Sequence, residues 1–207
     1  MRELSESAPN GHWLFFRKWM RSPLKVASIT PSSSALARAM TDSLPLDEGV
    51  VVELGGGTGS ITRALLAQGL PPEKIIVIER DKHFCDFLQD RFPGVRVLNG
   101  DALFLKSVLQ RANIQEPIRA VVSGLPFLSM NSRMQARLLK GTFAITHNQG
   151  PFIQFTYSPL SPLKRSVRDR MNVRECCTQQ VWNNFPPAKV WSFSCQSYEP
   201  SAEIRSE

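Results

Sequence analysis

The stretch that decides the fold runs from Val50 to Thr62 and reads VVVELGGGTGSIT. Its three valines and Leu54 predict a short buried strand of a parallel sheet, and the glycines predict a sharp turn into a helix that begins near Ser60. Glycine has no β-carbon and adopts positive φ readily, so an adenosine-bearing molecule can lie directly against this loop. Glu53 is an acid that closes an apolar strand, and it therefore needs a partner. The candidate binding positions of the loop are Gly55, Gly57 and Gly59.

The spacing of the glycines separates this loop from other nucleotide-binding motifs. It is G-x-G-x-G rather than the G-x-G-x-x-G of dinucleotide-binding folds, and no Lys-Ser or Lys-Thr pair follows, which excludes a P-loop. The segment E-L-G-G-G-T-G resembles the first motif of the class I S-adenosylmethionine-dependent methyltransferases. That resemblance implies an α/β, Rossmann-like, seven-stranded sheet and S-adenosyl-L-methionine as cofactor, with Glu53 helping to organise its amino-acid end. A glycine-rich turn in another α/β protein is the alternative.

Two later strand ends carry further acids. Lys74 to Glu79 predicts a second buried strand, and Glu79 lies where a nucleoside-binding α/β fold places the carboxylate that accepts from ribose hydroxyls. Asp81 is the alternative, and one of the two is expected to cap a helix over 82–92. A third strand over 95–98 is followed by Asn-Gly-Asp-Ala. The resemblance implies that the acid there, Asp101, receives the adenine amino group. The cofactor-binding set is completed by Ala102 and Ser123.

The loop after the predicted fourth strand, Ala120 to Ser123, should face the transferable methyl group, because ligands of open α/β sheets bind at the carboxyl ends of the strands. Its sequence S-G-L-P-F resembles the N-L-P-Y type loop of the ribosomal RNA adenine dimethyltransferases, whose Asn or Asp accepts hydrogen bonds from the target amine. Ser123 is shorter than either residue. This departure argues against a base amine as the target, although an RNA methyltransferase stays open as an alternative.

Motifs across most of the chain resemble the bacterial phospholipid N-methyltransferases. The motifs are S-G-L-P, an early P-S-S after a basic aromatic segment, Q-F-T-Y at Gln154 to Tyr157, and N-F-P-P-A-K-V-W at Asn184 to Trp191. This resemblance implies methylation of phosphatidylethanolamine towards phosphatidylcholine by a peripheral enzyme on the inner face of the cytoplasmic membrane. Another aminolipid, such as ornithine lipid, is an alternative substrate. A terminal antiparallel hairpin is expected near residues 172–182 and 189–195.

Three side chains are candidates for the chemistry at the amine. Tyr157 could accept or relay the proton, Ser123 could orient the amine, and Phe127 could offer a ring face to the cationic headgroup. A core tyrosine that satisfies its hydroxyl locally is the alternative for Tyr157.

The N-terminal segment predicts a basic amphipathic helix. Its cations fall on one side and most of its aromatic residues on the other, which is typical of a helix that lies in an anionic bilayer surface. The predicted membrane contacts are Trp13, Phe16, Arg17, Trp19, Arg21 and Lys25. The alternative is a helix that covers the domain's own core. We expect residues 1–45 to form a membrane-binding extension and cofactor lid, and residues 46–207 to form the methyltransferase domain.

Composition limits the partners. The chain has 25 basic and 18 acidic residues, a net charge of +7, which suits nucleic acid and an anionic membrane equally. We expect membrane phospholipids as partners and no nucleic acid. No metal is expected, because the four cysteines form no C-x-x-C pair. The cysteine pattern also indicates a reducing cytoplasm. The uncharged stretch 141–163 is interrupted by polar residues and prolines, so it is not expected to span a membrane. A basic run over 158–174 is either a solvated face or a phosphate-binding patch near the mouth of the active site.

Overall fold

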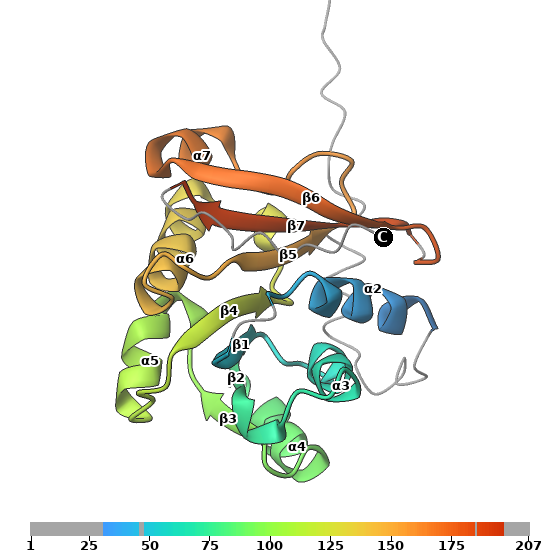
Figure 1. Cartoon of the computed structure of the whole chain (residues 1–207), viewed down its shortest axis with the longest axis vertical. Helices are drawn as coiled ribbons and strands as arrows, with labels where there is room; N and C mark the ends of the chain where they lie inside the picture. Colours follow the sequence, from blue (N-terminus) through green and yellow to red (C-terminus); the bar gives the residue numbers. More distant parts are fainter. Residues whose placement is uncertain (1–30, 46–47, 185, 197–207) are drawn as a thin grey trace, which may run out of the picture. The chain divides into compact units, whose positions relative to one another are not determined.

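The computed structural model describes residues 31–45, 48–184 and 186–196, and these form a seven-stranded sheet flanked by helices (Figure 1). The strand order is β3-β2-β1-β4-β5-β7-β6, with β1 to β5 parallel and β7 antiparallel to both β5 and β6. The predicted Rossmann-like sheet with a terminal hairpin is therefore confirmed. The strands are β1 (Val50–Leu54), β2 (Ile75–Glu79), β3 (Arg96–Asn99), β4 (Ile118–Ser123), β5 (Phe152–Thr156), β6 (Val173–Val181) and β7 (Ala188–Cys195).

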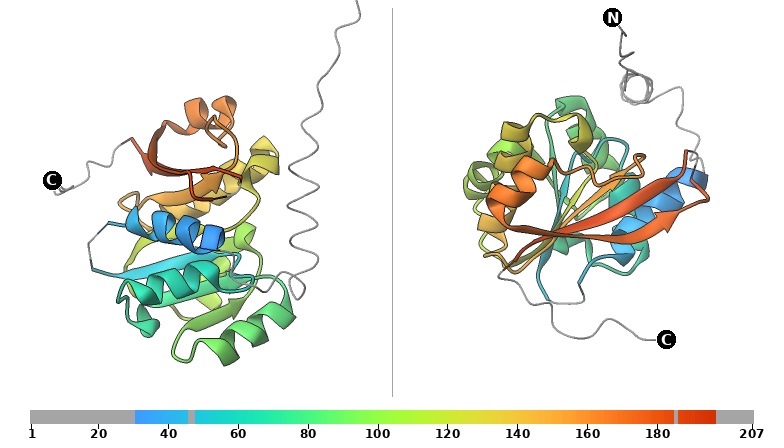
Figure 2. Two further views of the ribbon diagram at one scale, coloured as in Figure 1. Left: turned by 90° about the vertical axis from the view of Figure 1, so that its right-hand side faces the viewer. Right: turned by 90° about the horizontal axis from the view of Figure 1, so that it is seen from above.

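Helices cover both faces of the sheet (Figures 1 and 2). One face carries α2 (Pro31–Asp42), α3 (Ser60–Ala67) and α4 (Lys82–Arg91). The other carries α5 (Leu105–Arg111), α6 (Ser132–Ile145) and α7 (Arg165–Met171). Short 3-10 turns lie at η1 (Pro72–Lys74), η2 (Ala102–Phe104) and η3 (Phe127–Ser129). The central strands are thus buried on both faces, which explains why β1 and β2 are apolar except for one glutamate each, Glu53 and Glu79.

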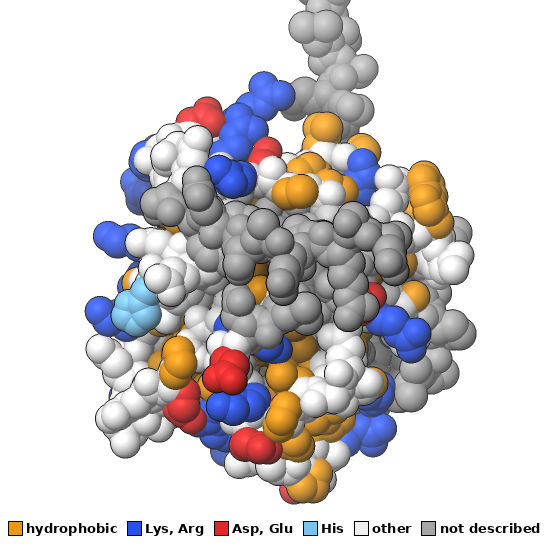
Figure 3. Space-filling view, viewed as in Figure 1, with side chains coloured by type: hydrophobic (Ala, Val, Ile, Leu, Met, Phe, Trp, Pro, Cys, Tyr) orange, Lys and Arg blue, Asp and Glu red, His pale blue; other side chains and the backbone are white. Residues whose placement is uncertain are grey.

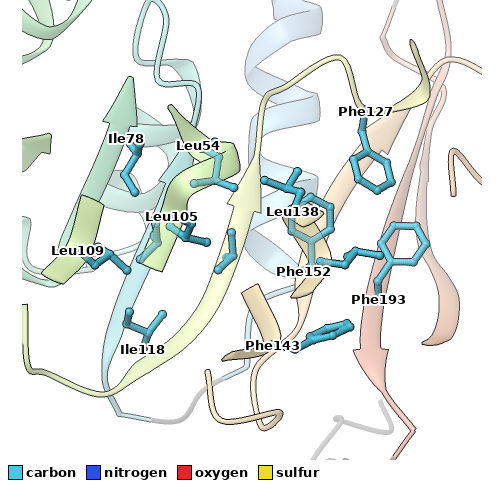
Figure 4. Close-up of a cluster of buried hydrophobic side chains, with 14 of the residues drawn as sticks. Leu54, Ile78, Leu105, Leu109, Ile118, Phe127, Leu138, Phe143, Phe152 and Phe193 are labelled. Atoms are coloured by element: carbon cyan, nitrogen blue, oxygen red, sulfur yellow. The ribbon is translucent and has the colours of Figure 1, made fainter. Parts of the chain in front are cut away.

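The core on the α5–α6–α7 face is closed by aromatic rings (Figure 4). The ring of Phe127 lies 5.3 Å from that of Phe152 and 6.1 Å from that of Phe193, measured between centroids. These three rings come from η3, β5 and β7. They tie the loop after β4 to the terminal hairpin, so the position of that loop depends on the packing of distant segments.

Helix α6 was not predicted, because two polar residues lie in its buried stripe. The stripe consists of Gln135, Leu138, Leu139, Thr142 and Phe143 and has the helical spacing i, i+3, i+4, i+7, i+8. Gln135 and Thr142 are both 0% exposed, so they occupy core positions that an apolar pattern would assign to leucine or valine. The available signal was the N-cap, since Asn131 accepts a hydrogen bond from the backbone N–H of Met134 at 2.9 Å.

The helix α2 shares the core of the sheet domain. Its buried side chains Leu36, Ala37, Ala39 and Met40 belong to the same hydrophobic cluster as β1 and β2. The compact unit therefore begins at Pro31. The helix α2 thus covers one face of the sheet, while the predicted membrane-binding extension and lid over residues 1–45 stay a prediction. The predicted membrane-contact residues, from Trp13 to Lys25, fall outside the described residues.

The helix α7 and its basic residues lie at the edge where the parallel strands begin. Because β7 is antiparallel to β5, its end at Cys195 pairs with Val173, the start of β6, beside the amino end of β5. Figures 1 and 3 view this amino edge, and Lys and Arg side chains gather over α7 in Figure 3. The exposed cations there are Lys164, Arg165, Arg170 and Arg174. The end of this run therefore lies at the amino edge, while its start follows β5 at the carboxyl edge, and a phosphate-binding role for the run stays a prediction.

No helix within the described ranges is both long and apolar enough to cross a membrane. The uncharged stretch 141–163 is divided among the end of α6, the strand β5 and two loops.

Candidate active site

The topology places a crevice at the carboxyl ends of β1 and β4. From β1 the chain proceeds outward to β2 and β3, and it then returns to the other side of β1 to form β4 and β5. Such a reversal of strand order is where open α/β sheets bind ligands. The two loops touch at this point: the N–H of Gly124 donates to the carbonyl of Leu54 at 2.9 Å. Strands β1 to β5 run from left to right in the left panel of Figure 2, so the crevice lies at their right-hand ends.

The three glycines of the loop differ in the space beside them: one faces open space and two pack against neighbouring side chains. Gly57 has φ +49°, and a β-carbon built on it meets no atom within 4 Å. Gly59 has φ +76°, and a β-carbon built on it would clash with the ring of Phe92, which occupies that space. Gly55 has φ +77°, and a β-carbon there comes within 2.8 Å of Leu125. Only Gly57 of these three thus faces open space, and the close approach at Gly59 comes from the protein's own core.

Glu53 is completely buried between β1 and α3. The Thr62 hydroxyl donates to Glu53 Oε2 at 2.6 Å, while Oε1 is buried without a hydrogen-bond partner. Burial raises the pKa of Glu53 from its ordinary value of 4.5 to about 8. The hydrogen bond from Thr62 lowers the pKa in part, and the charge of Glu79 raises it slightly further. The carboxyl group is therefore protonated at neutral pH and offers one free oxygen beneath the loop.

Glu79 holds the glycine loop from the neighbouring strand. Its Oε2 accepts from the N–H of Gly57 at 3.1 Å, and its Oε1 accepts from the N–H of Asp81 at 2.9 Å. A carboxylate has about four acceptor positions, so both oxygens can still accept from hydroxyl groups. Asp81 caps α4 instead, since its side chain accepts from His83 N at 2.8 Å. Asp81 is thus the acid that caps the helix, and the binding of ribose hydroxyls by Glu79 stays a prediction.

Asp101 follows β3 at the same edge. Its Oδ1 accepts from the N–H of Leu103 at 2.9 Å and so caps η2. The methyl group of Ala102 is buried in the core, which leaves only backbone atoms of that residue for a ligand.

These residues fit the cofactor that the resemblance implies. An open glycine position, an unpartnered carboxyl oxygen at Glu53 and acceptors on Glu79 and Asp101 lie at the ends of three adjacent strands, β1, β2 and β3. S-adenosylmethionine carries an ammonium, ribose hydroxyls and an adenine amine, and each of these groups needs an acceptor. Among the described residues no cluster of His, Cys, Asp and Glu could hold a metal ion.

Ser123 fixes the loop after β4. The residue is 0% exposed, and its Oγ accepts from the N–H of Leu125 at 3.2 Å. Because the hydroxyl oxygen has a second lone pair, its predicted contact with the amine stays a prediction. The packing of Phe127 argues against its predicted role, because its ring is buried against the rings of Phe152 and Phe193 rather than turned to a headgroup.

The structure brings together two motifs that are distant in the sequence, Q-F-T-Y and N-F-P-P-A-K-V-W. Gln154 pairs with Trp191 across β5 and β7, and the Tyr157 hydroxyl interacts with the side chain of Asn184, which is 4% exposed. Burial raises the pKa of Tyr157, and the hydrogen bond with Asn184 opposes this. Tyr157 therefore keeps its proton at neutral pH, which suits a relay better than an initial acceptor.

Sequence reasoning missed one polar residue at this edge. Gln154 was quoted within a motif but given no role, although a glutamine inside an apolar strand is an available signal. It lies beside Ser123 in the register of β4 and β5 and is 1% exposed.

Comparisons with known proteins agree with this geometry. No family model matches the chain. The ornithine lipid N-methyltransferase of Singulisphaera acidiphila is 35% identical over 151 residues, which cover 71% of this chain and 78% of that protein. The ribosomal RNA small subunit methyltransferase A of Bradyrhizobium diazoefficiens is 41% identical over 71 residues, but the match covers only 32% of this chain and 24% of that enzyme.

A solved structure shows the same fold. The TehB-like S-adenosylmethionine-dependent methyltransferase from Corynebacterium glutamicum superposes with a TM-score of 0.56 at 14% identity, covering 91% of this chain and 100% of that one.

Proposed function

Because the chain belongs to the class I S-adenosylmethionine-dependent methyltransferases, in the same family as the Singulisphaera ornithine lipid N-methyltransferase, we propose that it methylates the amine of a membrane aminolipid. The observation that carries the proposal is the similarity to that enzyme across most of both chains. Its name favours ornithine lipid as the first substrate to test. Phosphatidylethanolamine, the substrate implied by the sequence motifs, is the second; both lipids present a primary aliphatic amine.

The site suits an amine better than a nucleobase. Ser123 replaces the longer acceptor of the RNA adenine enzymes, and it is already bonded to Leu125 N. The short match to the ribosomal RNA methyltransferases keeps an RNA adenine substrate as the second candidate function.

Methyl transfer requires a neutral amine in line with the methyl group. When bound, S-adenosylmethionine supplies a methyl group on a sulfonium, which leaves as a neutral thioether. The nitrogen lone pair forms the new N–C bond as the S–C bond breaks, and the nitrogen gives up one proton per methyl group gained. We assign the relay of that proton to Tyr157, whose hydroxyl lies beside Asn184 just after β5.

We do not assign removal of the amine's proton to Glu53, although its pKa of about 8 suits a general base. Its carboxyl group lies on the α3 face of β1, bonded to Thr62. It is 0% exposed, and its remaining oxygen is buried without a hydrogen-bond partner at the end of β1, where the glycine loop begins. We assign Glu53 to the cofactor's ammonium group instead.

A membrane surface is the proposed partner. Two of the exposed large apolar side chains follow strands at the carboxyl edge: Leu128, 51% exposed, comes after β4, which borders the crevice, and Leu160, 73% exposed, comes after the neighbouring strand β5. Apolar side chains at the mouth of the site, together with a net charge of +7, suit insertion into an anionic bilayer. The basic aromatic segment with Trp19 and Phe16 is proposed to add to this contact. We also propose location at the inner face of the cytoplasmic membrane.

The deciding experiment offers labelled S-adenosylmethionine and anionic vesicles that contain ornithine lipid, phosphatidylethanolamine or neither. Label in one of the aminolipids, suppressed by S-adenosylhomocysteine, is the expected result and identifies the substrate. Ribosomal RNA in place of vesicles is the parallel arm. Label in RNA alone, or no label in lipid despite measurable cofactor binding, contradicts the proposal.

A further inference from the structure

Gln154 has the geometry of a residue held ready for a ligand. Its Nε2 donates to the carbonyl of Leu125 at 3.1 Å and to the carbonyl of Phe155 at 3.0 Å. Both partners are acceptors, so the amide nitrogen must face them, and the orientation of the amide is fixed. Its Oε1 then points away from both, and it is buried without any hydrogen-bond partner. A buried acceptor left unpaired costs about 1–3 kcal/mol, which calls for an explanation.

A second glutamine shows what a structural role looks like in this protein. Gln135 is also fully buried and also donates through Nε2 to two carbonyls, those of Phe127 and Pro162, each at 2.9 Å. Its Oε1, however, accepts from the N–H of Lys164 at 3.0 Å. The two side chains thus make the same donor contacts, and they differ in that only Gln135 has a partner for its oxygen.

Gln154 borders the candidate active site. Gln154 is next to Ser123 in the register of β4 and β5, so both side chains project from the same face of the sheet at its carboxyl edge. Its bond to Leu125 ties it to the loop that borders the crevice. On the other side its register neighbour is Trp191, whose Nε1 is likewise buried without a partner. The sheet therefore holds an unpaired acceptor on β5, one strand beyond β4, and an unpaired donor on β7, two strands beyond it, and both atoms are buried.

We propose that Gln154 orients the substrate amine by accepting one of its N–H groups with Oε1, taking the place of the longer acceptor that Ser123 lacks. This inference rests on the proposed amine methyltransferase function. A neutral primary amine has two N–H groups, a monomethyl amine has one and a dimethyl amine has none. Gln154 thus favours the steps in which the nitrogen still carries hydrogen, and it contributes nothing to a third methylation. It is a specificity residue for the degree of methylation.

The test compares Gln154→Met with Gln135→Met in the full-length protein, on anionic vesicles that contain the primary, monomethyl or dimethyl form of the aminolipid. We expect Gln154→Met to slow the first methylation about fivefold to tenfold, the equivalent of one hydrogen bond, and to leave any dimethyl step within twofold of the wild type. Gln135→Met should lower the melting temperature and change all steps in equal proportion. S-adenosylhomocysteine affinity should be unchanged in Gln154→Met.

A conservative variant keeps the test decisive if the wild type adds a single methyl group. Gln154→Glu is buried and therefore protonated, so it can donate to one carbonyl while its other oxygen remains an acceptor. It should recover a substantial part of the first-step rate that Gln154→Met loses. Equal slowing of every step by Gln154→Met, no slowing at all, or no difference between the Met and Glu variants overturns the inference. Absence of label in every lipid with the wild type would instead overturn the proposed function itself.

Discussion

The Thr62 hydroxyl donates to Glu53 Oε2 at 2.6 Å and thereby joins the first strand to the helix that follows the glycine loop. This bond is enclosed in the core, where an ionised carboxyl group is costly. Burial raises the pKa of Glu53 to about 8, so a single side chain couples folding to pH.

The first prediction concerns this coupling. Between pH 4.5 and about 8 the folded protein keeps the Glu53 proton that the unfolded chain releases, so the wild type loses stability as the pH rises, by up to about 1.4 kcal/mol per pH unit. Glu53→Gln cannot ionise, so it removes this pH dependence of the free energy of unfolding. Urea unfolding at pH 5, 6 and 7.5 should show that the free energy of unfolding of the variant increases relative to that of the wild type as the pH rises. Two stability curves that run parallel over this range would show that Glu53 ionises freely in the folded protein.

The second prediction separates two glycines of one motif. Gly57→Ala meets open space and should melt within a few degrees of the wild type, since the left-handed conformation costs about 1–2 kcal/mol, yet it should bind S-adenosylhomocysteine at least tenfold more weakly. Gly59→Ala meets the Phe92 ring and should lose several kcal/mol of stability. The double variant with Phe92→Leu should recover part of that loss. Thermal melting and calorimetric titration measure both effects; full cofactor affinity in Gly57→Ala would show that the cofactor lies elsewhere.

The third prediction concerns Tyr157, whose hydroxyl is protonated at neutral pH because burial raises its pKa. Tyr157→Phe should lower kcat about a hundredfold by removing the relay, which is the lower end of the range for lost proton transfer. Affinity for S-adenosylhomocysteine should be unchanged. Turnover with vesicle lipid is the measurement, and unchanged turnover removes Tyr157 from the chemistry.

The fourth prediction concerns the basic residues of α7. The double variant Arg165→Gln, Arg170→Gln should change KM for vesicle lipid by less than twofold, because these exposed side chains lie at the amino edge of the sheet. Arg168 is left in place because it pairs with Glu175 at 2.9 Å. A large rise in KM would indicate that α7 contacts the bilayer while the site is engaged.

Local patterns were sufficient to place the strands and the acids and glycines at their ends. The valine run, the glycines and the acids Glu53, Glu79 and Asp101 each signal their place through neighbours within a few residues, because strand ends and turns depend on local backbone conformation. The helix α6 escaped this reasoning, since Gln135 and Thr142 are polar in sequence and are buried only because loops from distant segments satisfy the glutamine.

The sequence by itself determined the class of fold, the glycine loop and the position of an acid at or just after the end of each of the first three strands. Only the tertiary structure decided which of the candidate residues are buried and what they pack against. It buried Phe127 among rings from β5 and β7, filled the space at Gly59 with Phe92, and placed the arginines of α7 at the opposite edge from the site. It also left the Gln154 oxygen without a partner. Burial and hydrogen-bond satisfaction are set by contacts between segments far apart in the chain, and no local pattern records them.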